Sequence, residues 1–220
     1  MFVDSPTELT TAVTDLILAL QSLATIVMLK RSHVRRPMWT DVWTLFFGLL
    51  CLASFLGAVA HGIRMTTSFQ TAIWGTIYLA MGLMMALFAV AAVTMTWNHE
   101  LSRRYVPFCT AIAIGFFAIT QLWSDSFLLF IVYEAISMIV ALSLYTACFW
   151  FRREHGSEFL AAGVMVGIAA AIVDTQTSMQ VTMIWTFDNH GVFHLVQMLS
   201  LLLITIGIQM SHRPELVQGV

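Results

Sequence analysis

The chain has 220 residues, of which 59% are hydrophobic and only 10% are charged. A soluble domain of this size could not cover so much apolar surface with polar side chains, so the composition excludes a soluble globular protein and places the chain in a bilayer. The net charge of −2, with basic residues confined to short loop clusters, excludes a nucleic-acid-binding protein.

Apolar segments long enough to cross a membrane recur along the whole sequence. A helix rises about 1.5 Å per residue, so about twenty apolar residues span a hydrocarbon core of about 30 Å. We expect one domain over residues 1–220, an all-α integral membrane protein built as a seven-transmembrane-helix bundle with short loops. The expected spans are 8–29, 38–63, 69–97, 105–122, 126–151, 157–182 and 185–211.

The basic residues predict the orientation. Of the ten Lys and Arg residues, all except Arg64 fall in alternate loops, the side that the positive-inside rule assigns to the cytosol. The sequence therefore predicts an outside N-terminus and a cytosolic C-terminus in a plasma or inner membrane. The residues on the predicted cytosolic side are Lys30, Arg31, Arg35, Arg36, Arg103, Arg104, Arg152, Arg153 and Arg213.

Small residues at helical spacing form a ridge in the sixth predicted span. Gly163 and Gly167 are four residues apart, and Ala170 and Ala171 continue the ridge. Small side chains let two membrane helices approach closely. We therefore expect another helix to pack against this ridge.

Ionisable side chains cost free energy inside a membrane span, so those found there are candidates for a functional role. Six such residues lie in the outer half of the predicted spans. We expect the three carboxylates among them to lie seven or eight residues from the outer ends of their spans, a depth of about 10–12 Å. The six residues are Asp15, His61, Glu134, Asp174, His190 and His194.

Three of these residues have the pattern of a metal site. His190 and His194 are four residues apart, so a helix places both imidazoles on one face. His61 lies at the outer end of another span and supplies a third imidazole. Three histidines with an open fourth position are typical of catalytic zinc, so the sequence predicts a zinc site.

Other interpretations stay open at this point. His61 with His190 or His194 could ligate one haem in a membrane electron carrier. The polar cluster could instead only tie helices together in a non-enzymatic subunit or receptor. Glu134 has a possible ion-pair partner in Arg64, and Asp15 could serve as a helix tie.

The layout resembles the CREST superfamily of seven-helix membrane hydrolases, which groups alkaline ceramidases with the progestin and adiponectin receptor family. That family has a zinc-ligand His at the end of its second helix and a His-x-x-x-His pair at the start of the seventh. The matching residues are His61 in SFLGAVAHG and His190 with His194 in DNHGVFH.

The resemblance implies a zinc-dependent hydrolase that cleaves an amide or ester bond of a lipid near the outer leaflet. Two departures bear on its catalytic residues. Gly57 stands where the family has a Ser four residues before the helix-2 His, and Ser54 is the nearest serine. The family's acidic residue on helix 3 is missing, so its role as general base falls to Asp174, by preference, or Glu134.

The family's N-terminal calcium site is matched only loosely. Asp4, Glu8 and Asp15 are the acidic residues in the corresponding part of the chain. We therefore do not expect bound calcium.

Overall fold

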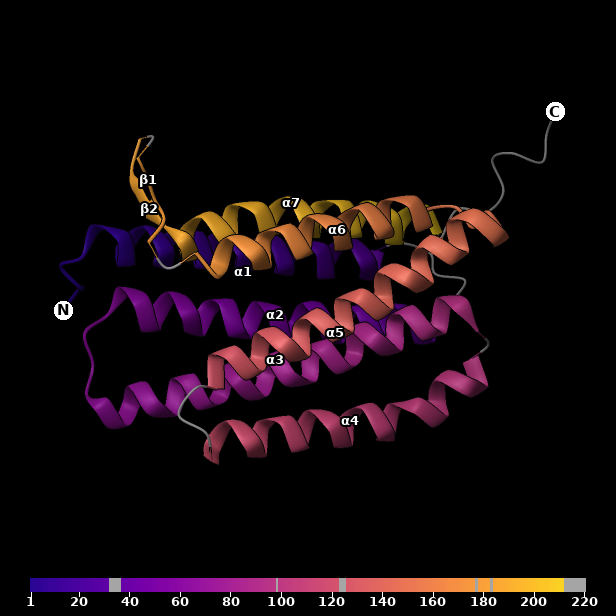
Figure 1. Cartoon of the computed structure of the whole chain (residues 1–220), viewed down its shortest axis with the longest axis horizontal. Helices are drawn as coiled ribbons and strands as arrows, with labels where there is room; N and C mark the ends of the chain where they lie inside the picture. Colours follow the sequence, from indigo (N-terminus) through magenta and orange to yellow (C-terminus); the bar gives the residue numbers. More distant parts are fainter. Residues whose placement is uncertain (32–36, 98, 123–125, 177, 183, 212–220) are drawn as a thin grey trace.

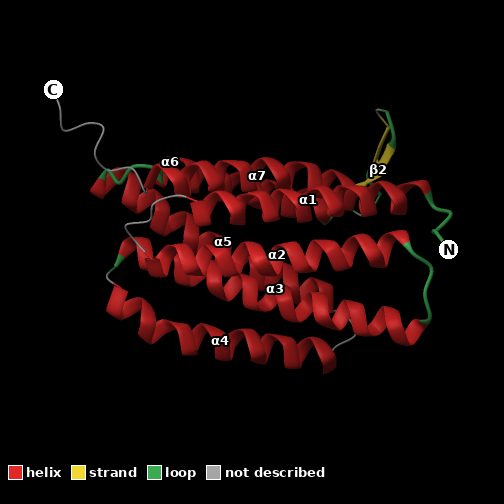
Figure 2. Ribbon diagram, turned by 180° about the vertical axis from the view of Figure 1, so that it is seen from behind, coloured by secondary structure: helices red, strands yellow, loops and turns green. Residues whose placement is uncertain are grey.

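The computed structural model describes residues 1–220 except 32–36, 98, 123–125, 177, 183 and 212–220. The chain is almost entirely helical, and one small hairpin projects from one end (Figure 2). The elements are α1 (Pro6–Arg31), α2 (Pro37–Gly62), α3 (Thr67–Thr96), α4 (His99–Leu122), α5 (Ser126–Ala147), the π-helical turn η1 (Cys148–Arg152), α6 (Ser157–Asp174), β1 (Gln180–Thr182), β2 (Thr186–Asp188) and α7 (Asn189–Ser211).

Successive helices run antiparallel, as short connections require, so α1 begins at one end of the bundle and α7 ends at the other (Figure 1). α1 packs on both α2 and α7, α2 on α3, and α6 on α7. α4 lies on the outside, mainly against α3. We call the end where α2 ends and α7 begins the histidine end, and the end where α1 ends and α6 begins the basic end.

Within the described residues, seven helices are long and apolar enough to cross a membrane, which confirms a multi-span membrane protein. Large apolar side chains such as Leu20, Leu45, Phe108 and Ile136 point out of the bundle and are more than two-fifths exposed. Such side chains suit contact with lipid tails. The predicted cytosolic residues Arg35, Arg36 and Arg213 lie outside the described residues, as does the side chain of Arg103.

The predicted boundary between the last two spans is wrong. α6 ends at Asp174 instead of residue 182, α7 begins at Asn189 instead of residue 185, and an antiparallel β1–β2 hairpin fills the connection. The segment after Asp174 is rich in polar and β-branched residues, which favour turns and strands over helix. Asp174 therefore lies at the end of its helix, not seven or eight residues inside it, and the connection is not a tight loop.

α7 begins where a side chain caps it. The carboxylate Oδ1 of Asp188 accepts a hydrogen bond of 2.8 Å from the backbone N–H of Gly191, the arrangement of an N-cap residue. Thr11 of α1 donates to the same oxygen at 3.0 Å. The cap therefore fixes the start of α7 and also its position against α1.

The small-residue ridge of α6 packs against α7, as expected. A methyl group added to Gly163 would lie 2.7 Å from Cγ1 of Ile204, so only glycine allows this approach. The Ser200 hydroxyl of α7 donates to the Gly163 carbonyl at 2.8 Å. At the basic end, Gly156 has φ 87°, and a side chain there would meet the Gly207 carbonyl.

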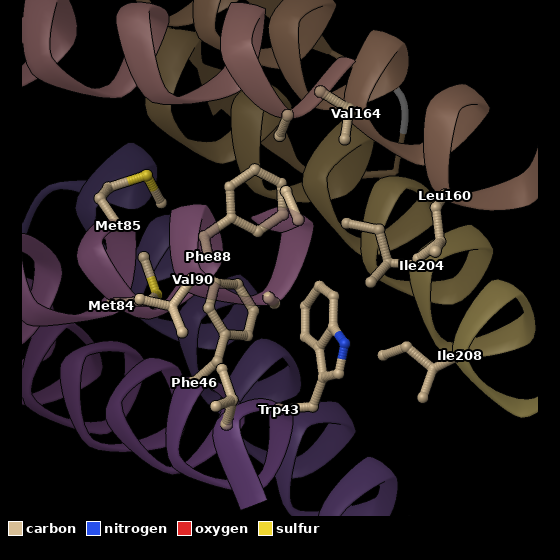
Figure 3. Packing of buried hydrophobic residues seen from close by; sticks show 14 of the residues in the cluster. Trp43, Phe46, Met84, Met85, Phe88, Val90, Leu160, Val164, Ile204 and Ile208 are labelled. Atoms are coloured by element: carbon tan, nitrogen blue, oxygen red, sulfur yellow. The ribbon is translucent and has the colours of Figure 1, made fainter. Parts of the chain in front are cut away.

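Aromatic and aliphatic side chains fill the space between α2, α3, α6 and α7 (Figure 3). Trp43 is fully buried, and its ring lies edge-on to Phe46 at 5.3 Å and to Phe88 at 6.0 Å. Edge-to-face pairs at this spacing add to the packing energy. Trp39 also donates from Nε1 to the Ala91 carbonyl at 3.2 Å, which ties α2 to α3.

Candidate metal centre

A cavity of about 750 Å³ runs from the histidine end into the apolar interior. Every membrane-spanning helix except α4 contributes to its described lining. Its volume lies in the range of small-molecule binding sites. All three predicted zinc ligands line it, and so do apolar side chains such as Phe46, Phe88 and Ile204. The cavity is therefore polar towards one end and apolar towards the other.

His61 lies in the last turn of α2 and is held by α1. Its Nδ1–H donates to Oε2 of Glu8 over 2.7 Å, and its ring packs edge-on against Trp74 of α3 at 5.6 Å. A carboxylate on Nδ1 fixes both the ring orientation and the tautomer, so Nε2 is the nitrogen through which His61 would bind a metal.

His190 lies in the first turn of α7 and is held by the end of α6. Its Nδ1–H donates to Oδ1 of Asp174 over 2.6 Å. Asn189 holds Asp174 in turn, since its side-chain amide donates to the Asp174 backbone carbonyl at 2.7 Å and to the same Oδ1 at 3.5 Å. The His190 side chain keeps 41% exposure, against 12% for His194, so the site opens beside His190.

His194 is held by the hydroxyl of Thr14. The Thr14 hydroxyl lies 2.9 Å from both the Thr11 carbonyl and His194 Nδ1, so it accepts from Nδ1–H when its own hydrogen is donated to Thr11. In that arrangement the Nε2 of His194 presents a lone pair. That Nε2 lies 3.5 Å from Oδ1 of Asp15. A lone pair and a carboxylate face each other stably only with a cation or a proton between them.

Asp15 reaches this position because Gly57 of α2 has no side chain. A methyl group added to Gly57 would lie 2.6 Å from Oδ2 of Asp15 and 2.9 Å from its Cγ. The carboxylate thus occupies the space next to α2 that a side chain at position 57 would fill. Asp15 itself is buried, with 6% exposure.

The three imidazoles surround the same cavity end without forming a closed site. The ring centroids of His61 and His190 are 6.4 Å apart. In a tetrahedral zinc site with zinc–nitrogen bonds of about 2.0–2.1 Å, two such centroids lie about 5 Å apart. Among the residues that the structure describes, no group of three or more His, Cys, Asp or Glu side chains already has metal-binding geometry. The donor set therefore suits zinc, but the rings must close by about 1 Å to hold it.

The remaining predicted site residues lie in the cavity wall. Glu134, Ser54 and Asp174 are all buried and all line it. The alternative ion pair of Glu134 with Arg64 is wrong, because Arg64 pairs with Asp4 beside the N-terminal segment.

The acidic residues considered for calcium do not share a site. Asp4 pairs with Arg64, Glu8 with His61, and Asp15 faces His194. Each carboxylate thus has its own partner.

Sequence reasoning missed the contribution of α1 to the centre. Glu8, Thr11 and Asp15 recur at spacings of three and four residues, which places them along one face of a helix. Glu8 contacts His61 and Asp15 contacts His194, and Thr14 beside them holds Nδ1 of the same ring. This row of polar residues on one face of an otherwise apolar span is the sequence pattern that could have predicted the contribution of α1 to the site.

Comparison with known proteins places the chain in a family. Residues 10–212 match the model of a family of unknown function, DUF6962, so the chain belongs to that family. Neither the curated proteins nor the solved structures contain a match.

Proposed function

We propose that this protein is a zinc-dependent membrane hydrolase that cleaves an amide or ester bond of a lipid. The observation that carries the proposal is the state of His194. Thr14 contacts its Nδ1, which leaves Nε2 facing the buried Asp15 carboxylate at 3.5 Å, and a cation between them would bind both.

His61, His190 and His194 would hold the zinc through Nε2. Each ring has its Nδ1 bonded to an oxygen of a neighbouring helix, from Glu8, Asp174 and Thr14 respectively. Metal-binding histidines are commonly oriented in this way. When bound, zinc acts as a Lewis acid on a carbonyl and lowers the pKa of a coordinated water to about 7.

The carboxylates then divide into two roles. Asp174 contacts Nδ1 of His190 and is a positioning residue, which differs from the general base that we expected from the sequence. Asp15 is the carboxylate nearest to a predicted metal-binding nitrogen, at 3.5 Å from His194 Nε2. We assign to Asp15 the acceptance of a proton from the attacking water and its return to the leaving amine or alcohol.

The apolar part of the cavity suits an acyl chain. Leu, Phe, Ile and Met side chains line it below the histidines, including Met81, Met84 and Met85, for which the sequence alone favours core or lipid-facing filler. The positive-inside rule assigns the histidine end to the outer side, with the N-terminus outside and the C-terminus in the cytosol of a plasma or inner membrane.

The test measures metal and hydrolysis on the same detergent-purified protein. We expect about one zinc per chain and release of fatty acid from an N-acyl amine or ester lipid. His194→Ala should lose both, and His155→Ala, which alters a histidine at the basic end, should lose neither. A haem absorbance band, or hydrolysis that persists in His194→Ala, would contradict the proposal.

A further inference from the structure

Two polar side chains deeper in the cavity have no role in the metal centre. Glu134 of α5 is 7% exposed, and its carboxyl group lies within electrostatic range of Asp174 but has no side-chain hydrogen bond to a described residue. Gln197 of α7 also lines the cavity, and its buried Oε1 has no hydrogen-bond partner in the described part of the chain. Buried polar groups are normally bonded, so unpartnered ones in a cavity wall require a separate explanation.

These acceptors lie below the metal centre and above the apolar end. Gln197 follows His194 by three residues on α7, which places it about 4.5 Å further into the bundle. Glu134 lies about two turns inside α5, whose first turn is set back from the adjacent ends of α2 and α3 (Figure 1). Beyond them, side chains such as Phe88 and Ile204 close the cavity.

The chemistry of the two groups defines what they can bind. The oxygens of a carboxyl group and of a side-chain amide accept hydrogen bonds, so their partner must present a donor. A plain alkyl chain would leave both acceptors unpaired when it displaces water from the cavity, which costs free energy. A hydroxyl group on the chain at this depth would donate its one hydrogen to the Gln197 oxygen and would accept from the carboxyl group of Glu134 when that group carries its proton.

We propose that the cavity selects a lipid whose buried chain carries a hydroxyl group a few bonds from the cleaved carbonyl, with Glu134 and Gln197 as the hydrogen-bond partners of that hydroxyl. The rise of about 4.5 Å from His194 to Gln197 corresponds to about three to four bonds of an extended chain, counted from the carbonyl carbon to the hydroxyl oxygen, as in a 3-hydroxy acyl chain. The inference names the substrate class of the proposed hydrolase and rests on that function only for the position of the carbonyl.

The experiment measures binding to metal-free protein in nanodiscs, so its outcome does not depend on zinc or on turnover. The N-methyl amides of octadecanoic, 3-hydroxyoctadecanoic and 12-hydroxyoctadecanoic acid compete with a fluorescent fatty acid. The 3-hydroxy amide should bind about tenfold more tightly than the unsubstituted amide. The 12-hydroxy amide should bind no better than the unsubstituted one, because its hydroxyl would lie among apolar side chains.

Two variants separate recognition from a structural role. Glu134→Leu and Gln197→Met remove the acceptors but keep side chains of similar size, so each should abolish the preference and leave the melting temperature unchanged or higher. Ser143→Ala, at an exposed serine of α5 that bonds only its own helix, is the matched control and should retain the preference.

Three results would overturn the proposal. They are equal binding of the three amides to the unaltered protein, no displacement by any of them, and a lowered melting temperature in both variants with the preference retained. Absence of zinc from the protein would instead refute the proposed function and leave this binding result unaffected.

Discussion

The histidine end and the basic end of the bundle differ in what fills the space between the helices. At the basic end, side chains such as Trp43, Leu160 and Ile208 are fully buried and pack against one another. At the histidine end, buried carboxylates, hydroxyls and imidazoles from α1, α2, α6 and α7 bond to one another around an open cavity.

The difference indicates that the closely packed core and the polar cavity are separated along the length of the bundle. Close packing contributes most of the favourable energy of helix association in a bilayer, where the hydrophobic effect between helices is small. An end that is packed in this way can hold the helices while the other end keeps costly polar groups ready for a ligand. The predictions below test this separation, starting with the largest expected effect.

Asp15→Asn should remove the group that handles protons and keep the metal. We expect turnover to fall by about 10²–10⁴-fold, the usual contribution of a general acid–base residue, with zinc content unchanged. Rates on an N-acyl lipid and elemental analysis of the same sample measure the two quantities. Loss of zinc together with activity would show instead that Asp15 is a metal ligand.

Trp43→Ala should affect stability instead of catalysis, because Trp43 lies at the closely packed basic end. Truncation of a buried Trp creates a cavity and should cost about 3–5 kcal/mol of stability, with zinc content unchanged below the melting temperature. Thermal unfolding in detergent measures the change. Trp150→Ala, at a side chain with 69% exposure, is the control and should change little. Equal destabilisation by both would argue against a packed basic end.

Asp174→Asn should weaken metal binding without abolishing it. Asp174 orients His190 through Nδ1, and loss of such a contact typically reduces metal affinity by about 10–100-fold. Titration with a competing chelator measures the affinity, and Asp41→Asn on the exposed surface of α2 is the control. An unchanged zinc affinity would mean that Asp174 only ties α6 to α7.

Gly57→Ala should have the smallest effect. The added methyl group would meet the Asp15 carboxylate at about 2.6 Å, so we expect a loss of about 1–3 kcal/mol and a displaced Asp15. Gly48→Ala in the same helix adds a methyl group where nothing lies within 4 Å and should leave stability unchanged or higher. Thermal unfolding of the two variants checks this, and equal melting temperatures would contradict the contact.

The sequence predicted the helix plan because apolar length alone specifies a membrane span. It also predicted that another helix packs against the ridge of Gly163 and Gly167, and the structure identifies that helix as α7. The predicted end of α6 was wrong because hydropathy does not distinguish a helix from the polar, β-branched hairpin that follows Asp174. That hairpin ends at Asp188, which caps the start of α7. The cap depends on how the Asp188 side chain meets the backbone of α7, and amino-acid composition does not reveal that geometry.

The site was predicted in part for a similar reason. His190 and His194 share a helix, so their spacing alone places them together, and His61 joins them at the cavity wall. Their partners Glu8, Thr14 and Asp15 come from α1: Thr14 contacts His194 across 180 residues of sequence, and Glu8 contacts His61 across 53. Their contacts depend on how α1 packs between α2 and α7, which no local pattern specifies.

The most direct test of the central claim is X-ray absorption at the zinc edge on protein purified with its native metal. We predict one zinc per chain with three histidine nitrogens at about 2.0–2.1 Å and one further light ligand. In His61→Ala the number of histidine ligands should fall to two, which shows that α2 contributes to the site. Absence of zinc, or an unchanged number of histidine ligands in His61→Ala, would contradict a centre formed by these three residues.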